Sequence, residues 1–275
     1  MKGKHILFLA IPAMMLASCG GNLGTEVTDS SAINDMLSNV ATKSEDVKNF
    51  KFVVDMNGTS YDKEAKKNVT SKSHIVYERN EDEEVHCKTE SENDKLKEDV
   101  DFYLVKNTTY QQVMYVDTYE DEDRTDSKDG EHTILCYGYE GHELDFAFSA
   151  MYTIVPSMFL SMVMDPTAYV SGTAEQEDAK TTIKYYTSGD KLTVTINVVP
   201  TELESIKKSD EEGSVSSSME IHYSKNVFTD GVVESTSNKG NKQKYTMKLE
   251  QKSKFAINLP SGWETKINQE AEAEA

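Results

Sequence analysis

Residues 192–198, LTVTINV, decide the fold because apolar and polar side chains alternate through the whole segment. A β-strand directs successive side chains to opposite faces, so this segment predicts a strand with one buried face and one face in water. Residues 181–186 precede it across Ser188-Gly189-Asp190, a turn-forming sequence. The two segments therefore predict a β-hairpin.

Short segments of the same kind recur along the chain, separated by turn-rich or highly charged residues. Consecutive strands with no helix between them favour an antiparallel meander. The Asn57-Gly58 pair predicts a turn after the first of these strands. The other predicted strands are residues 47–56, 73–79, 84–89, 100–106, 109–119, 132–139, 214–223, 227–237, 242–250 and 254–259.

Two segments predict helices. The first begins after residues 29–31, where Asp29, Ser30 or Ser31 can cap a helix. This helix is predicted to end near residues 41–46. The second, LDFAFSAMYTIVPSMFLSMVM at residues 144–164, is apolar enough to raise a membrane span as an alternative. Polar residues at every fourth position, an internal proline and the absence of flanking lysine or arginine favour a buried amphipathic helix instead.

The chain shows no linker between residues 32 and 263, which predicts a single domain. Residues 19–31 are glycine-rich and polar and predict a flexible tether. Residues 264–275 predict a disordered tail.

Residues 16–19, LASC, end a short apolar segment that follows Lys2 and Lys4. A charged start, an apolar core and small residues make up a secretory signal, here residues 1–18. The cysteine directly after the small residues resembles the lipobox of bacterial lipoproteins. The resemblance implies that Cys19 carries a diacylglyceryl group and a further acyl chain such as palmitate, and that it becomes the first residue of the mature protein.

This anchor implies a location on the extracytoplasmic face of a bacterial membrane, to which several acyl chains attach a protein stably. The alternative is ordinary signal cleavage near Ala13 or Ala17, with an unmodified cysteine. Removal of residues 1–18 changes the formal charge from −19 to −21. This charge disfavours nucleic acid as a partner and direct adsorption to anionic lipid.

Cys87 and Cys136 follow Cys19, and the sequence leaves open a disulfide or two buried thiols on neighbouring strands. The histidines are scattered without metal-ligand spacing, which predicts surface or strand-edge positions. Acidic residues 78–84 and 120–131 lack the EF-hand spacing and predict solvated hairpin tips. Because no catalytic motif is present, we expect no enzyme, no catalytic residue, no metal and no cofactor.

The element order runs from a lipidated cysteine through a helix, a long meander, an apolar helix and more strands to FAINLPSGW at residues 255–263. This order resembles the LolA/LolB/LppX-type lipoprotein superfamily. The resemblance implies a mainly β (α+β) fold: a single highly curved antiparallel sheet, or half-barrel, of about eleven strands with two helices covering its concave face. In that family the concave face and its helices form an apolar cavity for acyl chains or lipoproteins.

Two functions fit these features. The first is a membrane-anchored lipoprotein that binds or carries a hydrophobic ligand such as a lipid, in a cavity beneath the helix at 144–164. The second is a structural or interaction lipoprotein with a packed core and an envelope protein as partner. Methionines suit either an adaptable pocket or a plain core. The candidate cavity-lining residues are Phe50, Phe52, Met151, Met158, Phe159, Met162, Val194 and Ile196.

The lipobox makes processing depend on the Cys19 sulfur. A Cys19→Ala variant should remain an unprocessed or poorly processed precursor without lipid label, because the acceptor of the diacylglyceryl group is gone. Gel mobility and metabolic labelling with a fatty acid measure both effects, and Ser18→Ala, which keeps the sulfur, should be processed normally. Normal processing and labelling of Cys19→Ala would exclude the lipoprotein interpretation.

Overall fold

The computed structural model describes residues 23–62, 67–93, 96–121, 131–139, 146–166, 179–208 and 213–267. The predicted signal peptide and Cys19 lie outside these residues, as does most of the predicted acidic tip at 120–131.

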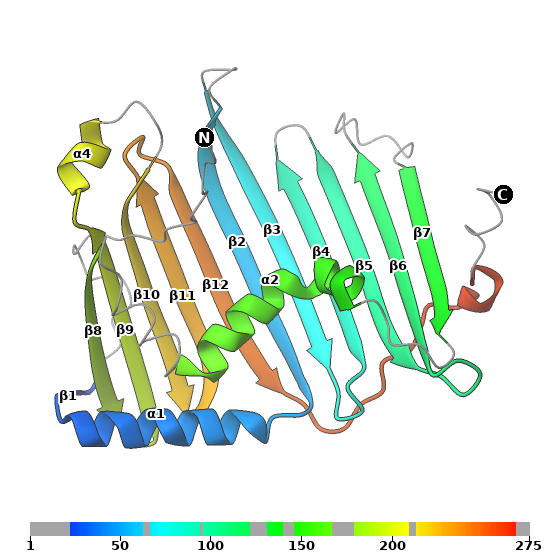
Figure 1. Ribbon diagram of the computed structural model, residues 1–275, viewed down its shortest axis with the longest axis horizontal. Helices are drawn as coiled ribbons and strands as arrows, with labels where there is room; N and C mark the ends of the chain where they lie inside the picture. Colours follow the sequence, from blue (N-terminus) through cyan, green and yellow to red (C-terminus); the bar gives the residue numbers. More distant parts are fainter. Residues whose placement is uncertain are drawn as a thin grey trace. The chain divides into compact units, whose positions relative to one another are not determined.

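Within the described residues, twelve strands form one antiparallel sheet, which confirms the predicted mainly β fold class (Figure 1). Their order in the sheet is β1-β8-β9-β10-β11-β12-β2-β3-β4-β5-β6-β7, so strands consecutive in sequence are mostly neighbours. The strands are β1 (Thr25–Val27), β2 (Phe50–Asp62), β3 (Lys67–Arg79), β4 (Val85–Asn93), β5 (Lys97–Lys106), β6 (Gln112–Asp121), β7 (Glu131–Tyr139), β8 (Ala179–Ser188), β9 (Lys191–Pro200), β10 (Ser214–Ser224), β11 (Val227–Ser237) and β12 (Lys242–Gln251). The helices are α1 (Ser30–Glu45), α2 (Phe146–Met164) and α4 (Leu203–Lys208), followed by a 3-10 turn, η1 (Trp263–Thr265).

The chain divides into two compact units, and the division runs through strands β2, β3 and β12. Unit 1 comprises Met1–Ser44, Met56–Thr70 and Met162–Thr246, and unit 2 comprises Glu45–Asp55, Ser71–Ser161 and Met247–Ala275.

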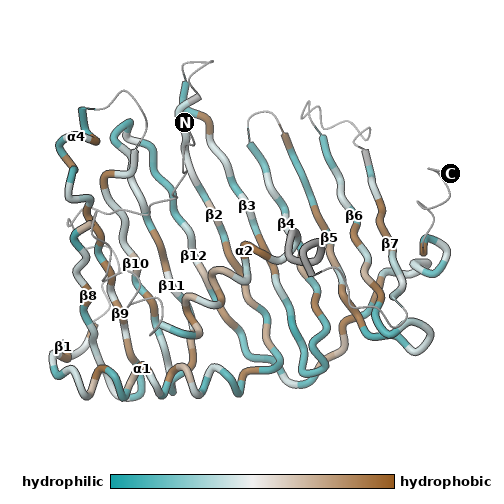
Figure 2. The backbone as a smooth tube through the Cα atoms, in the orientation of Figure 1, coloured by the Kyte–Doolittle hydropathy of each residue, from teal (hydrophilic) through white to brown (hydrophobic). Residues whose placement is uncertain are grey.

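In unit 1, hydrophobic residues recur along β9 (Figure 2), and Leu192, Val194, Ile196 and Val198 are buried as predicted. Thr193 and Thr195, predicted to face water, are buried as well. Val194 lies opposite Tyr185 on β8 and opposite Ile221 on β10, so apolar side chains from three strands form one row. The β8–β9 hairpin turns at Gly189, whose positive φ of 64° suits glycine. The sequence therefore predicts the hairpin and the apolar face of β9 correctly, but the prediction that its other face lies in water is wrong.

The predicted N-terminal helix also belongs to unit 1. Asp29 Oδ1 accepts the backbone N–H of Ala32 at 2.8 Å and thereby caps the first turn of α1. Leu37 and Val40 are buried on one side of the helix. Figure 1 shows α1 running across the ends of strands β8 to β11.

In unit 2, the strand register separates the sheet into two faces with different chemistry. Cys87, Phe102, Val116 and Leu135 lie opposite one another on β4 to β7 and define the helix face. The neighbouring residues His86, Tyr103, Tyr115 and Cys136 form the corresponding row on the reverse face.

The reverse face of unit 2 is partly covered by the C-terminal segment. Val113, Tyr115 and Cys136 form a buried cluster against which Trp263 and Ile267 pack. Gly138 permits this approach, because a Cβ there would lie 2.5 Å from the Tyr110 ring and 2.8 Å from Ile267. The predicted tail at 264–275 therefore begins too early, since Ile267 belongs to the fold.

Three local expectations are wrong. Asn57-Gly58 lies inside β2, because pairing with a strand on each side overrides the local turn preference, and Gly58 lacks the positive φ of a two-residue hairpin turn. Residues 254–259 form no strand. Thr25–Val27, within the predicted tether, form β1 by pairing with Tyr185–Thr187 of β8.

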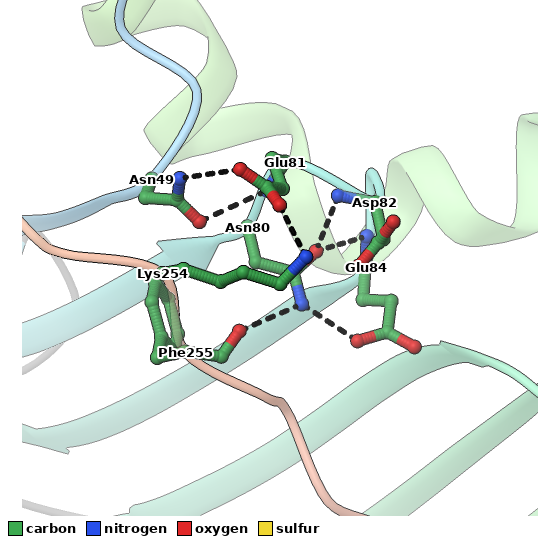
Figure 3. Close-up of polar contacts among 7 residues, drawn as sticks. All are labelled: Asn49, Asn80, Glu81, Asp82, Glu84, Lys254 and Phe255. Atoms are coloured by element: carbon green, nitrogen blue, oxygen red, sulfur yellow. Dashed lines mark hydrogen bonds and ion pairs between the residues drawn. The ribbon is translucent and has the colours of Figure 1, made fainter.

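A buried asparagine joins the β3–β4 turn to the C-terminal segment in unit 2 (Figure 3). Asn80 is 2% exposed, and its Oδ1 accepts the backbone N–H groups of Asp82 and Glu84, both at 3.1 Å. Its Nδ2 donates to Glu84 Oε2 at 2.6 Å and to the Phe255 carbonyl at 3.3 Å. One side chain thus fixes both the turn and the chain that passes it.

Two further contacts reinforce this junction. Lys254 forms an ion pair with Glu81. Asn49, just before β2, accepts the backbone N–H of Glu81 at 3.1 Å through Oδ1. The junction therefore brings together the start of β2, the β3–β4 turn and the segment after β12.

Replacing Asn80 with alanine should lower the free energy of unfolding by about 1–3 kcal/mol, because buried N–H and C=O groups lose their partners. Urea denaturation measures the change. Asp82→Ala removes an exposed side chain from the same turn and should stay within about 0.5 kcal/mol of the parent. Equal stabilities of the two variants would contradict the role assigned to Asn80.

Candidate functional site

The apolar helix predicted at 144–164 is present as α2, Phe146–Met164. It continues through Pro156, although proline removes the helical hydrogen bond to the carbonyl of Tyr152. Among the described residues, no helix meets the length and hydropathy expected of a membrane span.

In unit 2, the inner side of α2 packs on the helix face of the sheet. The rings of Tyr152 on α2 and Phe102 on β5 are stacked, with centroids 5.3 Å apart and planes inclined by 15°. Offset aromatic contacts of this kind stabilise a packed interface beyond the area they bury. Leu160, two turns further along the helix, is also buried.

The last turn of α2 belongs to unit 1 and is fixed there by a buried hydrogen bond. The Tyr223 hydroxyl on β10 donates to the Val163 carbonyl at 3.0 Å. Burial raises the pKa of Tyr223, so this hydroxyl stays protonated and remains a donor. Val163 itself is fully buried.

The outward side of α2 carries two large apolar residues among polar ones. Ile154 and Met158, one turn apart, are 54% and 62% exposed. Ser157 and Ser161 lie beside them and are exposed, in line with the predicted polar stripe. Large apolar side chains on a helix normally face the core, and among the described residues the only other large exposed hydrophobic residue is Tyr61, at 39%. We define Ile154 and Met158 as the outward pair.

The predicted cavity-lining residues have different environments. Phe50 and Phe52 are buried in the core of unit 2, and Val194 and Ile196 are buried in the core of unit 1. Phe159 and Met162 are half-buried on α2, and the side chain of Met151 lies outside the described residues. Met158 lies on the solvent side of the helix.

Sequence reasoning missed Ile154. The signal was available, since Ile154 and Met158 are four residues apart and such residues share one side of a helix. The apolar residues of this segment recur on every side, so the sequence could not show which side packs on the sheet.

The cysteines are two buried thiols. Cys87 lies on the helix face and Cys136 on the reverse face, with two strands between them, so they cannot form a disulfide. Burial raises the pKa of Cys87 to about 12 and that of Cys136 to about 11. Both are therefore thiols at neutral pH and lack the thiolate that nucleophilic chemistry requires.

His86 lies on the reverse face between two carboxylates. Its Nε2 is 2.7 Å from Asp101 Oδ1, its Nδ1 is 3.1 Å from Glu78 Oε2, and its ring stacks on Tyr103. Burial alone would lower the pKa of His86, but the hydrogen bonds to Asp101 and Glu78 outweigh it and the pKa is raised.

The same arrangement occurs at His222 in unit 1. Hydrogen bonding to Asp230, with Nδ1 2.6 Å from Oδ1, raises the pKa of His222, and Glu220 contacts the other ring nitrogen at 2.8 Å. At both histidines, each of the two ring nitrogens contacts a carboxylate, and the nitrogens are not directed at one common ligand. Within the described ranges, no group of three or more potential ligands could hold a metal ion.

Comparisons with known proteins find likeness among solved structures. No protein-family profile matches the chain, and no curated protein sequence matches it. Solved structures that are similar include a β-barrel-like protein of the DUF1849 group from Brucella abortus, with 9% identity, a TM-score of 0.26, and coverage of 75% of this chain and 99% of that chain.

Two further structures show similar coverage. A DUF1329 family protein from Desulfovibrio piger has 7% identity and a TM-score of 0.27 over 84% of this chain and 96% of its own. An outer membrane lipoprotein-sorting protein domain from Vibrio parahaemolyticus has 7% identity and a TM-score of 0.24 over 85% of this chain and 97% of its own. TM-scores of this size establish neither a common family nor a common function.

The environment of His86 makes stability depend on pH. Because its pKa is raised on folding, the ion pairs contribute fully below about pH 6.5, the ordinary value, and the contribution is lost as pH rises through the folded-state pKa. His86→Gln should therefore cost most at low pH and progressively less at higher pH.

Urea unfolding of parent and variant, from about pH 6 to about pH 9, measures this difference. Asp101→Asn, which removes one of the two charges, should weaken the same pH dependence without abolishing it. A cost of His86→Gln that is constant across the range would contradict the assigned ion pairs.

Proposed function

We propose that the protein is a membrane-anchored extracytoplasmic lipoprotein that binds an apolar ligand, such as a lipid acyl chain, at helix α2. The observation that carries the proposal is the outward pair, Ile154 and Met158, on a helix whose opposite side already packs on the sheet. The lipobox at Cys19 supports the anchored location.

Contact with water leaves apolar area of this helix unburied. Full burial of an isoleucine or methionine side chain is favourable by about 1.5–3 kcal/mol, and roughly half of each outward side chain is still exposed. A ligand chain that covered both would therefore gain about 1 kcal/mol from each residue. Methionine adapts its shape to irregular apolar partners, which suits an acyl chain.

The sheet beneath α2 supplies a rigid platform for such binding. Phe102 and Val116 on the helix face are almost fully buried, and Tyr152 stacks on Phe102. The tightly packed core also favours a second candidate function, in which the outward pair meets an envelope protein and no small ligand is bound.

Photolabelling in membranes tests the proposal on the full chain. Membranes from expressing cells receive a phospholipid with a photoactivatable diazirine in one acyl chain, and adducts are mapped by peptide mass spectrometry. Mapping separates label on α2 from lipid attached at Cys19. We expect adducts within Phe146–Met164.

The test variant carries both Ile154→Lys and Met158→Lys, and Tyr61→Lys is the control. The double variant should reduce labelling of α2 about tenfold or more, because a charged ammonium cannot be buried against an acyl chain. Tyr61→Lys adds a charge at another exposed site and should leave labelling unchanged. Absence of lipid adducts on α2, with protein cross-links from the same helix, would favour the interaction lipoprotein instead.

A further inference from the structure

The chain joins the folded body at Gly24, only five residues after Cys19. Gly24 lies against β8, where an added Cβ would be 2.2 Å from the Thr187 carbonyl oxygen and 3.1 Å from the Ser188 Cβ. Its φ of 94° suits glycine. From Thr25 onward the chain pairs with β8 as β1. A tether to Cys19 therefore extends no further than Gly24.

A segment of five residues has a short reach. A fully extended chain covers at most about 3.3–3.6 Å per residue, so Gly24 lies within about 18 Å of the Cys19 backbone. This limit holds for every conformation of the segment. An acylated Cys19 lies at the membrane surface, because its acyl chains are buried in the bilayer. The short segment therefore keeps the start of β1 close to the lipid.

The position of Gly24 determines which end of unit 1 is held close. Ser188, beside Gly24, comes directly before the β8–β9 turn. The β10–β11 turn lies next to that turn, because the Lys225 backbone N–H donates to the Asp190 carbonyl at 2.9 Å. We define these two turns, residues 188–191 and 224–227, as the near end of unit 1.

The opposite end of the same strands lies much further from Gly24. β9 has ten residues, and a strand of this length spans about 33 Å. Asp190 precedes β9 at the near end, and Glu202 follows it at the far end. The distance between the two ends exceeds the reach of the tether, so a membrane can distinguish them.

The charges of the near end suit a lipid surface better than the charge of the whole chain does. Lys191 and Lys225 are both exposed at the near end. Lysines close to a membrane are attracted to anionic headgroups. The chain that begins at Cys19 carries a formal charge of −21, so broad contact of its body with the same surface is unfavourable. Contact through the near end alone is therefore favoured.

We propose that the near end of unit 1 docks on the membrane that holds Cys19, with strands β8 to β11 extending away from the surface. The partner is the headgroup layer of the lipid, and the short tether determines which end meets it. This inference rests on the proposed anchor at Cys19 and does not depend on ligand binding at α2.

Quenching by labelled lipid tests which end lies at the membrane. The full lipidated chain, purified from membranes, is reconstituted into vesicles of phosphatidylcholine and phosphatidylglycerol with a nitroxide on a small fraction of the headgroups. Asp190→Cys and Glu202→Cys are matched variants, because each replaces an exposed acidic residue and places a fluorophore at one end of β9. The buried thiols of Cys87 and Cys136 should remain unlabelled.

Quenching should be several-fold stronger at position 190 than at position 202, because a nitroxide acts only at short range. A Gly/Ser insert of about 30 residues between Gly20 and Gly21 gives the tether a mean span of about 30 Å. This insert should reduce the quenching at position 190 several-fold, because the near end is no longer confined to the surface.

Vesicle flotation measures the anchor separately from the orientation. A chain that floats with the vesicles but is quenched equally at both positions, or more strongly at position 202, would overturn this inference and leave the anchor intact. Undiminished quenching at position 190 after the insertion would also overturn it, because the tether would then not determine the contact. A chain that does not float would overturn both the anchor and the inference that rests on it.

Discussion

The strand register of the sheet is the constraint on which the rest of the structure depends. Because paired residues on β4 to β7 share a face, Cys87, Phe102, Val116 and Leu135 form one row, and the residues beside them form another. The first row is apolar and needs a cover, which Tyr152 of α2 contributes by stacking on Phe102. The second row is more polar and holds the ion pairs of His86.

Sequence reasoning succeeded where a single local pattern was sufficient. The strand at residues 192–198, the turn at Gly189 and the cap at Asp29 each depend on neighbouring residues alone, and all three are present. The alternation did not show that Thr193 and Thr195 are buried too, because burial of that face depends on distant parts of the chain. It failed where long-range pairing decides. Asn57-Gly58 is held in β2 by strands on both sides, and Thr25–Val27 becomes a strand only because β8 lies beside it.

The candidate site shows the same limit. Composition identified α2 as the apolar helix but could not show that Met158 points outward, because the apolar residues of the helix are distributed around its whole circumference. The cysteine alternatives could not be separated either, since Cys87 and Cys136 differ in face only once the register of four strands is known. The carboxylates around His86 come from two neighbouring strands, so no spacing in sequence marks them.

The outward pair on α2 differs in physical character from the paired strands of the sheet. Pairing between strands satisfies backbone hydrogen bonds and demands a fixed register. Ile154 and Met158 offer apolar area, whose burial is favourable but not directional, so it accepts partners of many shapes. A flexible methionine beside an isoleucine therefore suits a partner without fixed geometry.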